Sequence, residues 1–109
     1  HDVMVSLGET TEVLKKKLIK AGVPKDDVDI CEFRSGTNLG RAICFSKGEC
    51  LIRLRKIPVS GHDFGVLQHE ILHVLHYIMN RIGMPLSDDS IEAYTYLIQY
   101  LTKEIYDKL

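Results

Sequence analysis

The amino-acid sequence predicts an α+β fold, in which helices cover one small three-stranded antiparallel sheet. Three observations lead to this prediction. One segment near the N-terminus and two segments in the second half of the chain repeat apolar residues at the spacing of a helix. The segments between them are short, rich in strand-forming residues and separated by turn residues. A run of strands followed by a run of helices is typical of α+β proteins.

The first part of the chain is expected to contain one helix. Residues 3–6 fit either a short strand or an extended arm. Thr10 or Thr11 is a suitable N-cap for a helix that continues through Ala21, because Gly22 then ends it. Four lysines within this helix are expected to form a solvated face, since apolar residues supply the buried side.

Three strands are expected to follow, at residues 28–33, 41–46 and 49–57. The turn between the last two is read as a tight hairpin turn at Lys47-Gly48. In that register the two hairpin cysteines, Cys44 and Cys50, are not directly opposed, and small apolar packing is their expected role.

Two basic residues of the third expected strand alternate with apolar ones. Arg53 and Arg55 follow Ile52 and Leu54 in turn. Alternation of this kind indicates a strand with one buried and one exposed face. Both arginines are therefore expected on the solvent side.

A long helix is expected from an N-cap at Asp63 to about Ile82, with Gly83 ending it. Nearly all of its circumference is apolar, which predicts a helix buried almost all round. A narrow polar stripe interrupts the apolar surface, formed by His69, His73, His76 and Asn80. Buried imidazoles need partners, and a metal ion would satisfy two of them at once.

The most informative stretch is His69-Glu70-Ile71-Leu72-His73. A helix places residues i and i+4 one above the other on the same face, so His69 and His73 can share one tetrahedral zinc. Glu70 then borders the ion closely enough to take a proton from a water molecule that the ion activates. His76 lies about 10 Å along the helix axis from His69, too far to share that ion.

The last helix is expected to start at Ser87, Asp88 or Asp89 and to continue to the C-terminus. Glu92 lies just inside it, 19 residues beyond His73. Because catalytic zinc sites commonly use three protein ligands and leave a fourth position for water, Glu92 is the expected third ligand. Asp88 and Asp89 are the alternatives, placed less well because they are at the cap.

The histidine pair with Glu70, followed by Glu92 on the next helix, resembles the gluzincin clan of zinc metallopeptidases. Within that clan, residues 63–68 and 89–94 resemble minimal single-domain members, and small metallopeptidases encoded by phages and prophages are similar. The resemblance covers about residues 50–105. It implies a zincin-like fold, zinc on His69, His73 and Glu92, Glu70 as the general base, and a peptide bound along the edge strand of the sheet.

The oxyanion formed during peptide hydrolysis needs a further donor. Tyr96, one turn beyond Glu92, and His76, one turn beyond His73, are the candidates. For each residue a purely structural role is the alternative. Better-known members of the clan often have an aspartate at the position of Tyr96, where it orients a histidine ligand.

Two functions from different classes follow from these residues. The first is a zinc-dependent peptidase, a hydrolase with Zn²⁺ as its cofactor. The second is a zinc-stabilised, catalytically weak binding or interaction module of a phage or defence context. Glu70 favours the enzyme, because a structural zinc site needs no general base and is usually closed by four protein ligands.

Length and composition limit the other possibilities. A chain of 109 residues predicts a single domain over residues 1–109. The net charge of −1 gives no reason to expect nucleic acid as a partner, so a peptide or protein substrate is expected. No apolar run reaches the length of a membrane span. Three cysteines, an odd number, favour reduced thiols and a cytoplasmic location.

Overall fold

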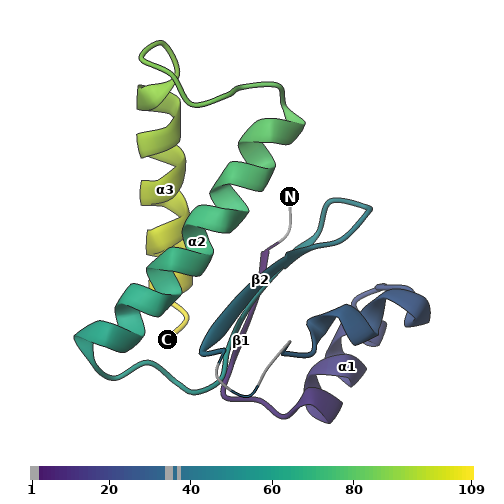
Figure 1. Ribbon diagram of the computed structural model, residues 1–109. Coiled ribbons are helices and arrows are strands. Elements are labelled where there is room, and N and C mark those ends of the chain that lie inside the picture. Colours follow the sequence, from purple (N-terminus) through teal and green to yellow (C-terminus); the bar gives the residue numbers. More distant parts are fainter. Residues whose placement is uncertain (1–2, 34–35, 37) are drawn as a thin grey trace.

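The computed structural model describes residues 3–33, 36 and 38–109. Figure 1 shows a small sheet between two helical layers, with α2 and α3 on one face and α1 on the other. The elements in chain order are β1 (Val3–Leu7), α1 (Thr11–Lys20), the 3₁₀ helix η1 (Lys25–Cys31), β2 (Gly40–Cys44), β3 (Cys50–Leu54), α2 (Gly61–Arg81) and α3 (Ile91–Tyr106). The predicted α+β class is confirmed.

The sheet is mixed, so the prediction of an antiparallel sheet is wrong in part. The strand order is β1-β3-β2, with β2 antiparallel and β1 parallel to β3. Residues 3–7 therefore form a strand rather than an extended arm. The parallel pairing brings this N-terminal strand beside a partner more than forty residues away in the sequence.

The strand predicted at residues 28–33 is wrong, because residues 25–31 form the 3₁₀ helix η1. Val28 and Cys31 are buried, whereas Ile30 between them is 44% exposed. A spacing of three between buried residues is the period of a 3₁₀ helix, in which side chains i and i+3 align. A strand would instead have buried Val28 and Ile30 on one face.

Both ends of α1 agree with the prediction. The Thr10 hydroxyl accepts a hydrogen bond from the Val13 backbone N–H at 3.3 Å, which caps the first turn. The helix ends at Lys20 with Ala21 as its C-cap. Gly22 follows with φ +97°, a conformation that favours glycine. Leu14 and Leu18 lie on the side of the helix that faces the sheet, and both are buried there.

The hairpin register differs by one residue from the predicted one. The Phe45 N–H donates to the Glu49 carbonyl at 2.8 Å, so three residues rather than two form the turn. Gly48 has φ +100°, as expected for the left-handed residue of a three-residue hairpin loop. The extra residue places Cys44 directly opposite Cys50. The prediction that these thiols are not opposed is therefore wrong.

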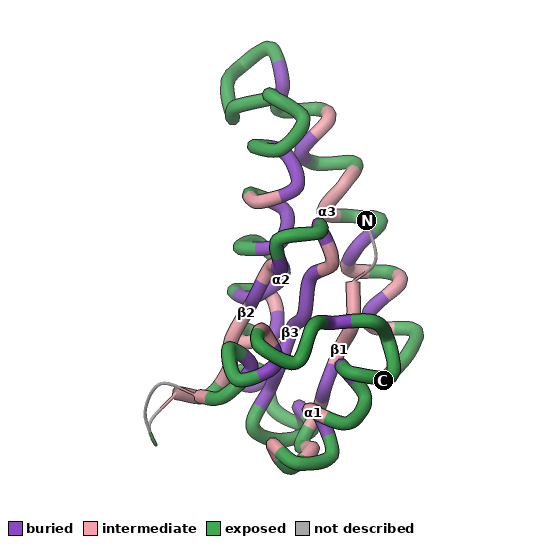
Figure 2. The backbone as a smooth tube through the Cα atoms, turned by 90° about the vertical axis from the view of Figure 1, so that its right-hand side faces the viewer, coloured by how far each residue is buried: buried purple, intermediate pink, exposed green. Residues whose placement is uncertain are grey.

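The central strand β3 is buried along its whole length, as Figure 2 shows. Cys50, Ile52 and Leu54 belong to the core under α2 and α3, while Leu51 belongs to the core under α1 and η1. Arg53 also lies on the α1 side and is only 3% exposed. Its expected place on a solvent face is wrong, because α1 and η1 cover that face.

Buried Arg53 is held by three acceptors. Its guanidinium donates to the Cys31 carbonyl at 2.9 Å, the Glu9 carbonyl at 3.2 Å and the Thr11 hydroxyl at 3.0 Å. These bonds offset the cost of burying a charge. Arg53 thereby joins β3 to the start of α1 and to the end of η1.

The long helix α2 begins earlier than predicted, because Ser60 rather than Asp63 is its N-cap. The Ser60 hydroxyl accepts from the Asp63 N–H at 3.2 Å, and the Asp63 carboxylate accepts from the Ser60 N–H at 3.3 Å. Asp63 is thus the third residue of a capping box. At the other end, α2 stops at Arg81, and Gly83 follows with φ +73°.

Only two sides of α2 are covered, so the prediction of a helix buried almost all round is wrong. Val74 and Ile78 face the core, but Leu72 and Ile82 are 54% and 58% exposed. The histidine stripe is exposed too. One sheet face and one helix do not enclose a third side.

In the part of the chain that the structure describes, no helix has the length and apolar character of a transmembrane span.

The last helix α3 starts with Ser90 as its N-cap residue, just beyond the three predicted cap positions. Its apolar side is buried, in agreement with the helical spacing of its apolar residues; the buried residues are Tyr94, Leu101 and Ile105. Phe64 stacks on Tyr106 with ring centroids 5.6 Å apart, and the Gln68 amide donates to the Thr102 hydroxyl at 3.2 Å. These contacts fix the side of α2 on which α3 packs.

Candidate metal centre

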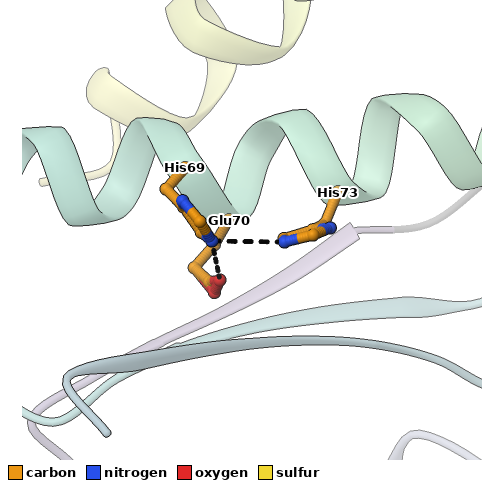
Figure 3. Close-up of side chains that lie close together, drawn as sticks. All are labelled: His69, Glu70 and His73. Carbon is orange, nitrogen blue, oxygen red and sulfur yellow. Dashed lines mark hydrogen bonds and ion pairs between the residues drawn. The ribbon is translucent and has the colours of Figure 1, made fainter.

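His69 and His73 present their Nε2 atoms to the same point in space. The two atoms are 3.2 Å apart, and the rings meet edge to face with centroids 4.9 Å apart. Their positions one turn apart on α2 account for this approach, as Figure 3 shows. Both side chains are exposed, so solvent reaches these nitrogens.

Glu70 lies beside the two histidines but is turned toward the sheet (Figure 3). Only 5% of the residue is exposed. Its Oε1 atom is 3.8 Å from the Nε2 of His69, and its Oε2 atom has no hydrogen-bond partner among the described residues. Burial raises the pKa of this carboxyl group, while the charge of a protonated His69 or His73 would lower it.

Gly40 on the edge strand β2 allows Glu70 to lie this close to the sheet. A Cβ atom at this position would be 3.2 Å from the Glu70 Cγ, and 2.9 Å from atoms of Leu54 and Val66. A glycine lets a neighbouring side chain approach its backbone closely. The carboxylate is therefore held between α2 and the first residue of β2.

An open hollow of about 570 Å³ lies between α2 and the edge strand β2, over the three side chains. The lining residues are Asn38, Gly40, Arg41, Ala42, Cys44, His69, Glu70, His73 and Tyr77. The hollow thus combines the two imidazoles, the buried carboxylate and the outer edge of a strand. It is large enough for a short segment of ligand.

The residues fit a metal ion. One ligand atom from each of His69, Glu70 and His73 lies within 4.8 Å of the other two. Two nitrogen ligands at about 2.05 Å from a tetrahedral zinc are about 3.3 Å apart. The observed separation of 3.2 Å agrees with that value. The unpartnered Glu70 oxygen is a further atom that a bound group could contact.

The structure does not bring Glu92 to the two histidines. Glu92 is exposed in the first turn of α3. That turn lies near the end of α2, since the Tyr94 hydroxyl donates to the Met84 carbonyl at 2.7 Å. His73 is eight residues before the end of α2, which is about two helical turns.

The direction of packing separates them as well. The α2 residues that contact α3, Phe64 and Gln68, lie about 100–180° around the helix from His69 and His73. In this arrangement α3 and the histidines occupy different sides of α2. The role of Glu92 as third ligand stays a prediction, and so does that of the alternatives Asp88 and Asp89, which are also exposed.

The two candidate oxyanion donors also lie outside the hollow. His76 is exposed, with its Nε2 atom 3.2 Å from the Asn80 amide nitrogen. Tyr96 is 68% exposed on α3. Neither residue is among those that line the hollow in the described part of the chain. Their catalytic role stays a prediction.

Of the nine described residues that line the hollow, the sequence pointed only to His69, Glu70 and His73; Tyr77 and Gly40 are two that it missed. Tyr77 follows His73 by one turn and lines the same hollow, with its hydroxyl 2.9 Å from the Arg81 guanidinium. Its helical spacing from His73 was a usable signal. Gly40 carried no such signal, because its role depends on how closely β2 approaches α2.

No protein-family model, no curated protein and no solved structure matches the chain.

Proposed function

We propose that this protein is a zinc-dependent peptidase. One observation carries the proposal: two histidine nitrogens converge at 3.2 Å, and a buried carboxylate with a free oxygen lies beside them. Zinc bound there would supply a Lewis acid that activates water and polarises a peptide carbonyl. The identity of the ion rests on the chemistry of the donor set, since two imidazoles with a carboxylate suit zinc.

Glu70 is the proposed general base. Glu70 follows His69 directly in the sequence, so its side chain leaves the helix in a different direction from those of the two histidines. It can therefore reach the space next to the ion without being a ligand itself. Burial raises its pKa, and a carboxyl group with a raised pKa accepts a proton more readily at neutral pH. Gly40 contributes by leaving room for the Glu70 side chain.

The edge strand β2 supports a peptide as the substrate. In the sheet order β1-β3-β2, only one side of β2 is paired with a strand among the described residues. An extended peptide can add to such an edge through backbone hydrogen bonds. The hollow extends from β2 to the histidines, so a peptide bound there would have its backbone close to Glu70.

Glu92 as the third protein ligand is part of the proposal, because the described structure does not place it beside the two histidines. Glu92 fulfils this role only if α3 takes a different position on α2. In the described arrangement the two proposed ligands are His69 and His73, with Glu70, the proposed base, beside them. A site with two histidines and no third ligand would bind zinc weakly and leave more than one coordination position for water.

The test pairs metal content with peptide cleavage on the same preparation. The wild type, loaded with zinc, is incubated with a peptide library, with and without a chelator, and Glu70→Gln is treated in parallel. We expect cleavage that the chelator abolishes, and a loss of about 10²–10⁴-fold in Glu70→Gln with zinc retained. A wild type that is fully loaded with zinc and cleaves no peptide would overturn the proposal that the protein is a peptidase.

That last outcome would favour the second candidate, a zinc-stabilised binding module with little turnover. The position of Glu92 bears on the lack of turnover in this candidate, because it leaves the ion with fewer protein ligands than a catalytic site commonly has. Zinc binding that raises the unfolding temperature, without cleavage of any peptide in the library, is its expected signature.

A further inference from the structure

Two cysteines meet at the end of the β2–β3 hairpin. Cys44 is the last residue of β2 and Cys50 is the first residue of β3, and they are directly opposed in the antiparallel pair. Their Sγ atoms are 2.9 Å apart. The three-residue turn determines this register, as described above, because a two-residue turn would have shifted the thiols past one another.

The backbone at this pair suits a covalent bond between the sulfurs. The neighbouring pair, Phe45 with Glu49, is joined by a backbone hydrogen bond, so Cys44 and Cys50 occupy a non-hydrogen-bonded position of the ladder. Cα atoms at such positions are about 4.5 Å apart, inside the range of about 4.4–6.8 Å found for disulfides. Closing the bond needs the sulfurs to approach by about 1 Å.

The two sulfurs differ in access. Cys50 is fully buried, whereas Cys44 is half-buried and lines the hollow between β2 and α2. A small reagent can therefore reach Cys44 through the hollow. The third cysteine, Cys31, is fully buried in the other core, under α1 and η1, and takes no part in this contact.

The hydrogen bond between the thiols affects their ionisation. It lowers the pKa of Cys50 and raises that of Cys44, because one proton is held between the two sulfurs. The pair therefore gives up its first proton more readily than two separate thiols would. Transfer of the remaining proton to Cys50, whose thiol then donates to the Cys44 sulfur, leaves the accessible Cys44 as the thiolate that reacts.

We propose that Cys44 and Cys50 form a reversible disulfide, with a small-molecule disulfide such as oxidised glutathione as the oxidant. The inference rests on the geometry of the hairpin and does not depend on the proposed peptidase. Cys44 also lines the hollow that contains the candidate metal centre. The disulfide would join β2 to β3 covalently at the edge of that hollow.

The exchange is balanced. The Cys44 thiolate attacks one sulfur of oxidised glutathione, which forms a mixed disulfide and releases one glutathione thiolate. The Cys50 thiolate then attacks the Cys44 sulfur, forms the protein disulfide and releases the second glutathione. The two cysteines lose two electrons and two protons, and oxidised glutathione takes up both as it becomes two molecules of the reduced form.

The experiment is a titration with mixtures of oxidised and reduced glutathione, followed by acid quenching, denaturation and alkylation. At the oxidising end we expect the protein to lose two hydrogen atoms and to retain one alkylatable thiol, at Cys31. Added reductant should restore all three thiols. In Cys50→Ala the accessible Cys44 should trap glutathione as a stable mixed disulfide, since the resolving thiol is gone.

Cys31→Ala is the matched control, because it replaces a buried cysteine outside the pair. It should form the disulfide at the same glutathione ratio as the wild type. A stable glutathione adduct on wild-type Cys44, a disulfide that includes Cys31, or three free thiols at a large excess of oxidised glutathione would each overturn the proposal. The circular dichroism of each variant verifies that it is folded before the titration.

Discussion

The Nε2 atoms of His69 and His73 lie 3.2 Å apart on successive turns of α2, with the carboxylate of Glu70 beside them. The capping box of Ser60 and Asp63 fixes the start of that helix. Gly40 fixes the distance of Glu70 from the edge strand. Local helix geometry and one close backbone contact therefore produce the arrangement of the candidate site.

The first prediction concerns the metal ligands. His69→Ala and His73→Ala should each lower zinc affinity by at least about 100-fold, because loss of a ligand exceeds the 10–100-fold effect of losing an outer contact. Chelator competition measures the affinity. His76→Ala is the control, since His76 shares the exposed stripe but contacts Asn80 instead. Unchanged zinc binding in His69→Ala would exclude the site.

The second prediction concerns the third ligand. Glu92→Ala should weaken zinc binding, whereas Asp89→Ala, its exposed neighbour before the helix, should not. The test is informative because the described packing of α3 keeps Glu92 away from the histidines, so an effect of Glu92→Ala would require α3 to move. If Asp89→Ala is the sensitive variant, the ligand lies at the helix cap. If neither variant matters, the packing of α3 on α2 stands and Glu92 is no ligand.

The third prediction tests how Glu70 is positioned. Gly40→Ala should destabilise the protein by about 1–3 kcal/mol, because its Cβ would lie 2.9 Å from Leu54 and Val66 and 3.2 Å from Glu70. Gly65→Ala is the opposite case. A helical glycine with nothing within 4 Å of its added Cβ should gain about 0.4–1 kcal/mol. Urea unfolding measures both, and equal signs would contradict the close contact at Gly40.

The parts of the fold that depend on local patterns were predictable from the sequence. Thr10 as an N-cap and the apolar side of α3 follow from residue type and helical spacing. The stripe of His69 and His73 follows in the same way. These features require only neighbours within about one helical turn.

The parts that depend on tertiary packing were not predictable. The parallel pairing of β1 with β3 joins segments more than forty residues apart. Arg53 is buried because α1 and η1 cover a face that alternation alone indicated as exposed. A single left-handed residue, Gly48, shifts the hairpin register and brings Cys44 opposite Cys50. The position of Glu92 depends on which side of α2 receives α3.

The last prediction links the chemistry of Glu70 to stability. In the metal-free protein, Glu70→Gln should be more stable than the wild type at neutral pH by roughly 1 kcal/mol or more, because an unpaired buried charge costs more than a buried amide. Burial raises the pKa of Glu70 above its ordinary value of 4.5. Between these two pKa values the folded wild type holds more protons than the unfolded chain.

The stability of the wild type should therefore fall as the pH rises through that window, while glutamine does not titrate. The advantage of Glu70→Gln should vanish below the unfolded pKa, grow up to the folded pKa and stay constant above it. Urea unfolding in chelator, from about pH 4 to about pH 7, measures the difference. The exposed control Glu12→Gln should stay within about 0.5 kcal/mol throughout. A Glu70→Gln variant less stable than the wild type at neutral pH would show that the carboxylate has a partner in solution, and would contradict the burial that raises its pKa.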